Sequence, residues 1–179
     1  MSEAALATFR FDANTCIPSA QPKEHAQVTL ESPGVDVMTD LAQVRAAAIE
    51  PEMTLFQAER TMIHQGVRSL FVVSHFPCVD GLITATDLIG ELPMQIVNKR
   101  NILHKDLCVA DLMTPLSLLD ALDYDELKKG TVSNVVATFK KIARSHLLVV
   151  QAATKQGPAR IRGVISLTQL ERQLGRALS

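Results

Sequence analysis

A threonine and an aspartate three residues apart are the most chemically suggestive pair in the sequence. They lie in the segment Gly81-Leu82-Ile83-Thr84-Ala85-Thr86-Asp87. If Thr84 begins a helix, its hydroxyl and the free backbone amides of the first turn favour an anion such as phosphate. One turn on, Asp87 can accept hydrogen bonds from two vicinal hydroxyls, and its charge strengthens both. The pair suits a ribose phosphate, but the same spacing is also that of an ordinary capping box.

The residues before this pair predict the elements that hold it in place. A short apolar stretch at 44–49 precedes Pro51, so the chain turns before Thr54 can cap a helix. That helix should end near Gly66 and turn Leu55, Ala58, Met62 and Ile63 to one side.

Two strands should follow. Residues 69–73 are few and rich in β-branched types, which favours a buried strand, and residues 79–83 favour another. Thr84 then begins a second helix through Ile89, which Pro93 should end or kink. The predicted order is strand, helix, strand, strand, helix.

The same signals occur twice along the chain, in the same order. A leucine stripe on the last helix, at 167, 170, 174 and 178, is typical of a core or of a subunit contact. The matching segments are 35–39 and 109–114, 54–58 and 131–135, 69–73 and 146–150, and 81–87 and 163–169. The chain therefore contains two copies of one unit.

Taken together, these segments resemble CBS-domain pairs, also called Bateman modules, over about residues 35–179. The resemblance implies an α+β fold in which two CBS units pack about a pseudo-twofold axis with two clefts between them. We expect a first CBS domain at 35–100 and a second at 105–179. Residues 1–34 form an N-terminal extension that we expect to be partly mobile. Either it is a loose tail, or it packs as a strand or arm on a neighbouring subunit.

The resemblance also implies a ligand. Clefts of such modules often hold AMP, ADP, ATP or S-adenosylmethionine, and the family uses the matching threonine and aspartate for phosphate and ribose. Thr84 and Asp87 are therefore the leading candidates. In the second copy Ser166 keeps the hydroxyl, but Gln169 replaces the aspartate and lacks its charge. We expect the second cleft to be weaker or empty.

Other candidates would complete the first cleft. The family places basic residues just before the middle strand, which here indicates Arg68 and His146, with Arg144 behind them. Each could equally be a solvated surface charge or a satisfied polar residue. The adenine would need an apolar slot, for which Ala47, Ala48, Ile49 and Ile83 are suitable.

Composition restricts the classes of partner. The formal net charge is −1, so the sequence lacks the basic character typical of proteins that bind nucleic acid. No apolar run approaches the roughly 20 residues that a membrane crossing needs. Three widely spaced cysteines, Cys16, Cys78 and Cys108, fit neither a disulfide framework nor a zinc cage. With an acidic start unlike a secretory signal, this predicts a cytoplasmic protein.

No enzyme motif is present. The sequence lacks G-x-S-x-G, a P-loop and H-E-x-x-H, so we expect neither catalysis nor a catalytic cofactor. His75 and Cys78 belong to a predicted loop, and the acidic residues at 120–126 should begin a turn or short helix.

Two functional hypotheses remain. One is a regulatory module that binds an adenosine nucleotide and signals to a protein partner in trans or through dimer geometry. The other is a ligand-free dimerisation or scaffold module. Both include a homodimer, because the apolar helices after Thr84 and Ser166 should be only partly covered within one chain.

Overall fold

The computed structural model describes residues 27–142, 144–153 and 158–178. Most of the predicted N-terminal extension lies outside these residues. None of the helices in the described part combines the length and apolar character that a membrane crossing needs.

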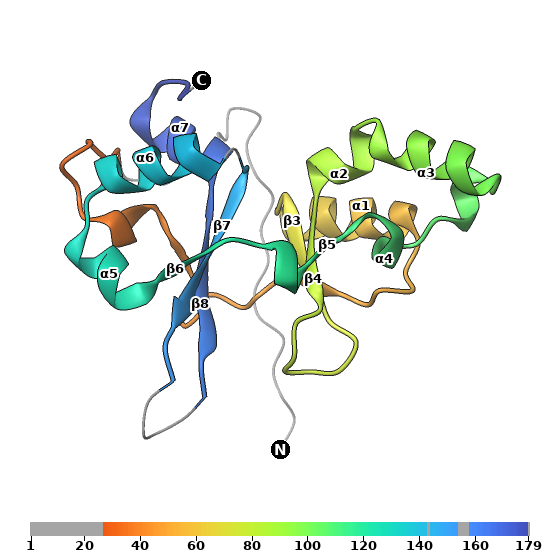
Figure 1. Cartoon of the computed structure of the whole chain (residues 1–179), viewed down its shortest axis with the longest axis horizontal. Coiled ribbons are helices and arrows are strands. Elements are labelled where there is room, and N and C mark those ends of the chain that lie inside the picture. Colours follow the sequence, from red (N-terminus) through yellow and green to blue (C-terminus); the bar gives the residue numbers. More distant parts are fainter. Residues whose placement is uncertain (1–26, 143, 154–157, 179) are drawn as a thin grey trace, which may run out of the picture.

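Two four-stranded sheets stand side by side in the middle of the molecule, with helices on their outer sides (Figure 1). In the first sheet the order is β2 (Ala48–Ile49), β3 (Ser69–Val72), β4 (Gly81–Thr84) and β5 (Thr114–Pro115). In the second it is β6 (Ala121–Asp123), β7 (His146–Gln151), β8 (Arg160–Ser166) and β1 (Thr39–Asp40). The predicted α+β fold of two similar units is confirmed.

Helices of different lengths accompany the strands. The first unit carries α1 (Leu55–Gln65), α2 (Ala85–Ile89), α3 (Leu92–Arg100) and α4 (Val109–Leu112). The second carries α5 (Tyr124–Lys129), α6 (Val132–Ile142) and α7 (Leu167–Leu174). Short 3-10 turns occupy Gly34–Val37, His104–Asp106 and Leu116–Leu118.

The two sheets exchange edge strands. β1 comes from the first copy of the repeat but pairs antiparallel with β8, with Thr39 opposite Val164. β5 opens the second copy but pairs antiparallel with β4, with Thr114 opposite Leu82. Each sheet is therefore completed by a strand from the other half of the sequence.

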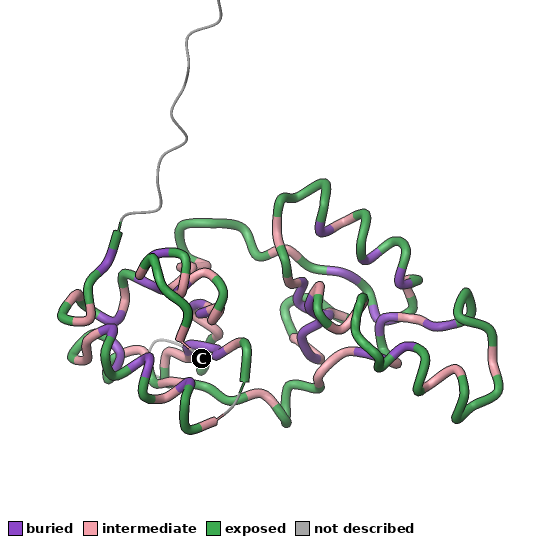
Figure 2. Tube along the Cα trace, turned by 90° about the horizontal axis from the view of Figure 1, so that it is seen from above, coloured by how far each residue is buried: buried purple, intermediate pink, exposed green. Residues whose placement is uncertain are grey.

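Each sheet has its own core, and a smaller cluster joins them. Viewed from above, the buried residues gather in two lobes (Figure 2). Phe71, Leu82 and Leu148 form a third buried cluster with residues from both sheets. The sheets thus pack through apolar side chains from both halves of the chain, and this contact fixes how the two units face each other.

Helix α1 follows the prediction closely, with one exception. Thr54 and Gln57 form a capping box, and Gly66 ends the helix with a φ of 65°. Leu55, Ala58 and Met62 are buried, but Ile63 is 71% exposed, so its predicted inward position is wrong. Each residue turns the helix by about 100°, which carries Ile63 away from the sheet that Met62 contacts.

The prediction for Pro93 is also wrong. Helix α2 ends at Ile89 because Gly90 takes an extended conformation, and α3 starts anew at Leu92. Pro93 lies in the first turn of α3, where its missing N–H costs no hydrogen bond. It helps to begin a helix instead of ending one.

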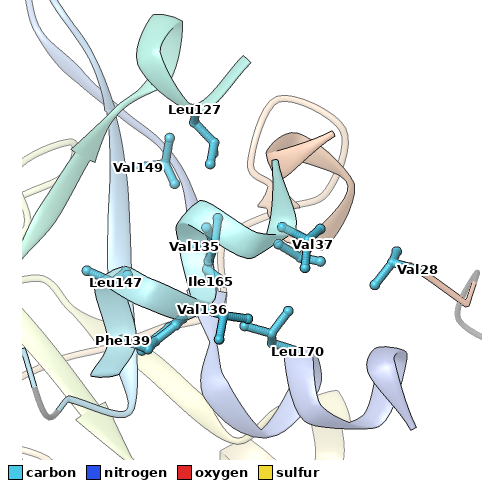
Figure 3. Packing of buried hydrophobic residues seen from close by; sticks show 11 residues of the cluster. Val28, Val37, Leu127, Val135, Val136, Phe139, Leu147, Val149, Ile165 and Leu170 are labelled. Atoms are coloured by element: carbon cyan, nitrogen blue, oxygen red, sulfur yellow. The ribbon is translucent and has the colours of Figure 1, made fainter. Parts of the chain in front are cut away.

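The described end of the N-terminal segment, residues 27–34, packs on the second unit of its own chain. The Val28 N–H donates to the Gln173 carbonyl at 3.2 Å, and the Gly34 N–H donates to the Gly130 carbonyl at 2.9 Å. Val28 lies at the edge of the core cluster, beyond Val37 and Leu170 (Figure 3). The leucine stripe of α7 also faces this cluster, so it belongs to the core.

Two glycines allow the exchanged strands to approach. A Cβ added to Gly163 would lie 2.7 Å from the Thr39 carbonyl oxygen. A Cβ added to Gly81 would lie 3.2 Å from the Met113 sulfur, and the Thr114 carbonyl oxygen would be closer still. Because a backbone oxygen cannot move aside cheaply, Gly81→Ala and Gly163→Ala should each lower the free energy of unfolding by about 1–3 kcal/mol.

Gly130→Ala is the matched control. Its added Cβ would meet no atom closer than 3.4 Å, and its φ of −85° suits alanine. Urea unfolding of the three variants measures the difference. A loss in Gly130→Ala as large as in the other two would contradict the close-approach argument.

Candidate functional site

Thr84 and Asp87 form a complete capping box at the start of α2. The backbone N–H and the hydroxyl of Thr84 both donate to Asp87 Oδ2, at 2.8 and 2.7 Å. The Asp87 N–H in turn donates to the Thr84 hydroxyl at 3.3 Å. The capping alternative is therefore realised. Among the described residues nothing donates to Asp87 Oδ1, and the residue is half-buried.

Strand pairing fixes where this box stands. Thr84 pairs with Ser69 across β3 and β4, and the Ala85 N–H donates to the Arg68 carbonyl at 2.8 Å. In the second unit Ser166 pairs with His146 in the same way. The Leu167 N–H there donates to the Ser145 carbonyl at 2.9 Å, so the two copies place these positions alike.

His146 and Asp87 come from different units and lie near each other. Burial lowers the pKa of His146, and the negative charge of Asp87 raises it by a smaller amount. Nδ1 of His146 also lies 3.0 Å from the Ser145 hydroxyl. The charge of Asp87, near the start of α2, thus acts on an imidazole at the start of β7 in the other unit.

The second copy does not reproduce the box. Ser166 occupies the N-cap of α7, but its side chain makes no capping hydrogen bond, and Gln169 is half-buried. An amide at the third helical position can complete such a box, as Gln57 does for Thr54, but Gln169 does not do so for Ser166. The hydroxyl is present without the partner that orients it.

The three basic residues predicted to face the ligand lie in different surroundings. Arg68 is exposed, and its described role is the backbone bond to Ala85. Arg144 is exposed and lies with its Nε 3.6 Å from Asp120 Oδ2. The charge of Asp87 acts on His146, the third basic candidate.

The residues of the predicted adenine slot lie in different surroundings. Ala48 and Ile49 line a cavity of about 540 Å³ beside α1, together with Phe56 and Arg60. Ile83 is completely buried in the first core. Ala47 accepts a hydrogen bond from the Phe71 N–H at 2.9 Å through its carbonyl, and Gly81 is buried against Met113 and Thr114.

An ion pair that the sequence analysis missed joins the exchanged strand β1 to β8. Arg162 Nη2 donates to Asp40 Oδ2 at 2.8 Å, and this bond holds the pKa of Asp40 below its usual value. The guanidinium also lies 5.0 Å from the Tyr124 ring. The sequence contains a sign of this pair, because the two copies differ at one position. Asp40 follows Met38-Thr39 in the first copy, whereas Pro115 follows the same two residue types in the second. Within the described residues no group of three acidic, histidine or cysteine side chains could hold a metal.

Comparison with known proteins identifies part of the chain by sequence. The model of the CBS domain family matches residues 35–93, which include Thr84 and Asp87. No curated protein matches the sequence.

Comparison with solved structures covers most of the chain. An uncharacterized conserved protein from Pyrococcus horikoshii has a TM-score of 0.57 and 20% identity, over 85% of this chain and 98% of that one. A CBS-domain containing protein from Agrobacterium tumefaciens has a TM-score of 0.55 and 16% identity, over 80% and 94%. CBSX2, solved in complex with AMP, has a TM-score of 0.50 and 19% identity, over 79% and 93%. These likenesses show a shared fold.

The difference between the two caps can be measured directly. Thr84→Ala removes a hydroxyl that accepts from the Asp87 N–H and donates to its carboxylate, so the free energy of unfolding should fall by about 0.5–2 kcal/mol. Ser166→Ala removes a hydroxyl with no capping bond and should change it by less than about 0.5 kcal/mol. Equal losses in urea unfolding would mean that the two caps are equivalent.

The burial of His146 predicts a dependence of stability on pH. Its pKa in the folded chain lies below 6.5, so the contribution is complete above pH 6.5. Below that pH, His146 binds a proton more readily in the unfolded chain than in the folded chain. The free energy of unfolding should therefore fall on acidification. Urea unfolding at about pH 7.5 and about pH 5.5 measures this loss, and both values lie above the ordinary pKa of aspartate and glutamate side chains.

His146→Gln should reduce the loss between these two pH values. His104→Gln, which replaces an exposed histidine, should leave it close to that of the wild type. An unchanged loss in His146→Gln would show that another group causes the acid sensitivity.

Proposed function

We propose that this chain, whose residues 35–93 match the CBS domain family, is a non-catalytic regulatory module that binds an adenosine nucleotide, or S-adenosylmethionine, beside Thr84 and Asp87. Nucleotide binding is signalled to a protein partner in trans or through the geometry of a homodimer, in the cytoplasm. The two CBS domains take residues 35–100 and 105–179.

The observation that carries this proposal is the Thr84 and Asp87 box at the start of α2, whose charge acts on His146 of the other unit. The cap uses only Oδ2 of Asp87, which leaves Oδ1 to accept from ribose hydroxyls. His146 comes from the other unit, so a ligand between them would contact both. Binding at this place would change how the units are held, which is what a regulatory module requires.

The comparison with CBSX2 gives further support. That protein shares the fold and was solved with AMP. In this chain the matched family segment, residues 35–93, contains the one copy of the repeat that has a complete threonine and aspartate box. An adenine nucleotide is therefore the ligand class to test first, while the number of its phosphates is left to the measurement.

The two repeats should not bind equally. Thr84 and Asp87 are oriented by each other, whereas Ser166 has no capping bond and Gln169 has no charge. A neutral amide forms weaker hydrogen bonds to ribose hydroxyls than a carboxylate. We therefore propose one dominant nucleotide site per chain, in the first unit.

A second candidate is a ligand-free scaffold. The observation that favours it is the engagement of Asp87 in its own helix cap, together with the placement of Ala48 and Ile49 in a cavity beside α1. Under this second proposal the same fold presents surfaces to other chains, and the Thr84 and Asp87 capping box only stabilises the start of α2.

Calorimetry on Asp87→Asn tests the nucleotide site. The substitution keeps an oxygen that can accept from the Thr84 N–H but removes the charge, so the affinity for AMP, ADP or ATP should fall at least about tenfold, equivalent to about 1.4 kcal/mol. Asp123→Asn is the control, because Asp123 is also a carboxylate at a helix start, the N-cap of α5 in the second unit. It should leave both the affinity and the number of sites, one per chain, unchanged.

Two results would reject the nucleotide proposal. One is a wild-type chain whose melting temperature does not move with any of the three nucleotides or S-adenosylmethionine at about millimolar concentration. The other is an Asp87→Asn variant that binds as tightly as the wild type. The scaffold function would then be retained.

A further inference from the structure

The cavity of about 540 Å³ in the first unit lies between the edge strand β2 and helix α1, and we call it the β2–α1 groove. Its lining includes Ala48, Ile49 and Glu50 from the strand and Phe56 and Arg60 from the helix. Ile49 is buried, whereas Phe56 is 65% exposed. An uncovered aromatic side chain beside a groove of this size indicates a binding surface.

The backbone of β2 has a free side along this groove. On the inner side β2 pairs with β3, where the Phe71 N–H donates to the Ala47 carbonyl at 2.9 Å. The Val73 N–H donates to the Ile49 carbonyl at 3.0 Å. Since the peptide groups of a strand alternate in direction, the N–H and the carbonyl of Ala48 point to the other side. Within the described residues no strand pairs there, so an extended segment can add to β2 at this edge.

The second unit covers the matching place with a helix of its own. Helix α5 lies between β6 and α6 in the sequence, where the first unit has only residues 50–54 between β2 and α1. α5 contacts β6, and its Leu127 is buried in the second core (Figure 1). The cavity that remains there is about 350 Å³, and Ser133 takes the place of Phe56 in the repeat. The first unit has no such cover among the described residues.

A segment suited to this groove precedes the described residues. In Ala7-Thr8-Phe9-Arg10-Phe11-Asp12 apolar and polar residues alternate, which is the pattern of a half-buried strand. Phenylalanine and threonine also favour strands. If the segment is added to β2 with Phe9 and Phe11 toward α1, both rings can cover Phe56, and Arg10 lies on the opposite face.

The charges on that opposite face are complementary. Ile49 belongs to the first core, on the side of α1, so the next side chain along β2, Glu50, lies on the other face. Glu50 is exposed and forms none of the ion pairs found among the described residues. Arg10 of an added strand would supply the missing cation.

We propose that residues 7–12 bind in the β2–α1 groove of their own chain as an added strand. The described chain begins at the second unit, where the Val28 N–H bonds to Gln173. Residues 12–26 can span roughly 50 Å when extended, whereas a folded chain of this length has a radius of gyration of about 16 Å. The groove of the first unit is therefore within reach.

The covalent connection favours the same chain over a second copy. A tethered segment has an effective concentration on the order of millimolar, so a contact too weak to join separate molecules is sufficient. The inference does not rest on nucleotide binding. It gives Ala48 and Ile49, which the sequence predicts to contact adenine, a neighbour from the chain itself.

Limited trypsin digestion of the full chain without nucleotide tests the proposal. Trypsin cleaves after Arg10, inside the segment, and after Lys23, outside it. Each rate is divided by the rate at the same bond in the chain unfolded in urea, which removes the effect of the flanking residues. Cleavage after Arg10 should then be at least about tenfold slower than cleavage after Lys23, because proteolysis follows the population of the unbound segment.

Matched variants locate the binding place. Phe56→Ser should raise the relative cleavage after Arg10 at least about fivefold, because it removes the exposed ring of the groove. Ile63→Ser is the control on the same helix: Ile63 is 71% exposed but does not line the groove, so the change should stay below about twofold. Circular dichroism verifies that both variants are folded.

A second pair of variants tests the charges. Glu50→Gln should raise the relative cleavage after Arg10 about twofold to threefold, as the loss of an exposed ion pair predicts. Glu52→Gln, which changes an exposed glutamate outside the groove, should leave it unchanged.

Amide hydrogen exchange distinguishes an added strand from a side-chain contact alone. The Ala48 N–H should exchange about fivefold faster in Phe56→Ser than in the wild type, because it bonds to the added strand. Cleavage after Arg10 as fast as after Lys23 would overturn the proposal, and so would protection that Phe56→Ser leaves unchanged. Protection that is lost on dilution from about 100 to about 1 μM would also overturn it, since a second copy would then supply the segment.

Discussion

The close packing of two edge strands against two glycines is the constraint on which the rest of this structure depends. Gly81 and Gly163 leave room for the backbone of the opposite repeat, so β5 completes the first sheet and β1 completes the second. Since each sheet then contains both halves of the sequence, the two units cannot separate without breaking hydrogen bonds in both. The apolar contact of Phe71, Leu82 and Leu148 is held by the same exchange.

The exchange also decides where the candidate site lies. β4 ends at the Thr84 cap, and β7 begins at His146. Because the two sheets stand side by side, the end of β4 and the start of β7 belong to the same region of the molecule. Neither Asp87 nor His146 is unusual in its own unit. The influence of the Asp87 charge on His146 is a property of the pair of units.

The sequence predicts the fold well because its signals are local and occur twice. Thr54, Gly66 and the strands around Leu70 and Leu147 were placed correctly, since caps, turns and short β-branched runs act over a few residues. Ile63 and Pro93 were misplaced because periodicity alone does not say which flank of a helix is covered, or that Gly90 separates two helices. The Asp40 and Arg162 pair spans the exchanged strands, and a reading within one unit cannot find it.

A reciprocal exchange between equal units is the arrangement that two separate copies of one short chain would adopt as a symmetric dimer. Here a single polypeptide contains both copies, so the partner of each unit is always present at a fixed ratio of one to one. Selection could then change one copy without changing the other. Ser133, Lys140 and Gln169 of the second copy occupy the positions that Phe56, Ile63 and Asp87 have in the first, so the two copies already differ in charge and polarity at matching places.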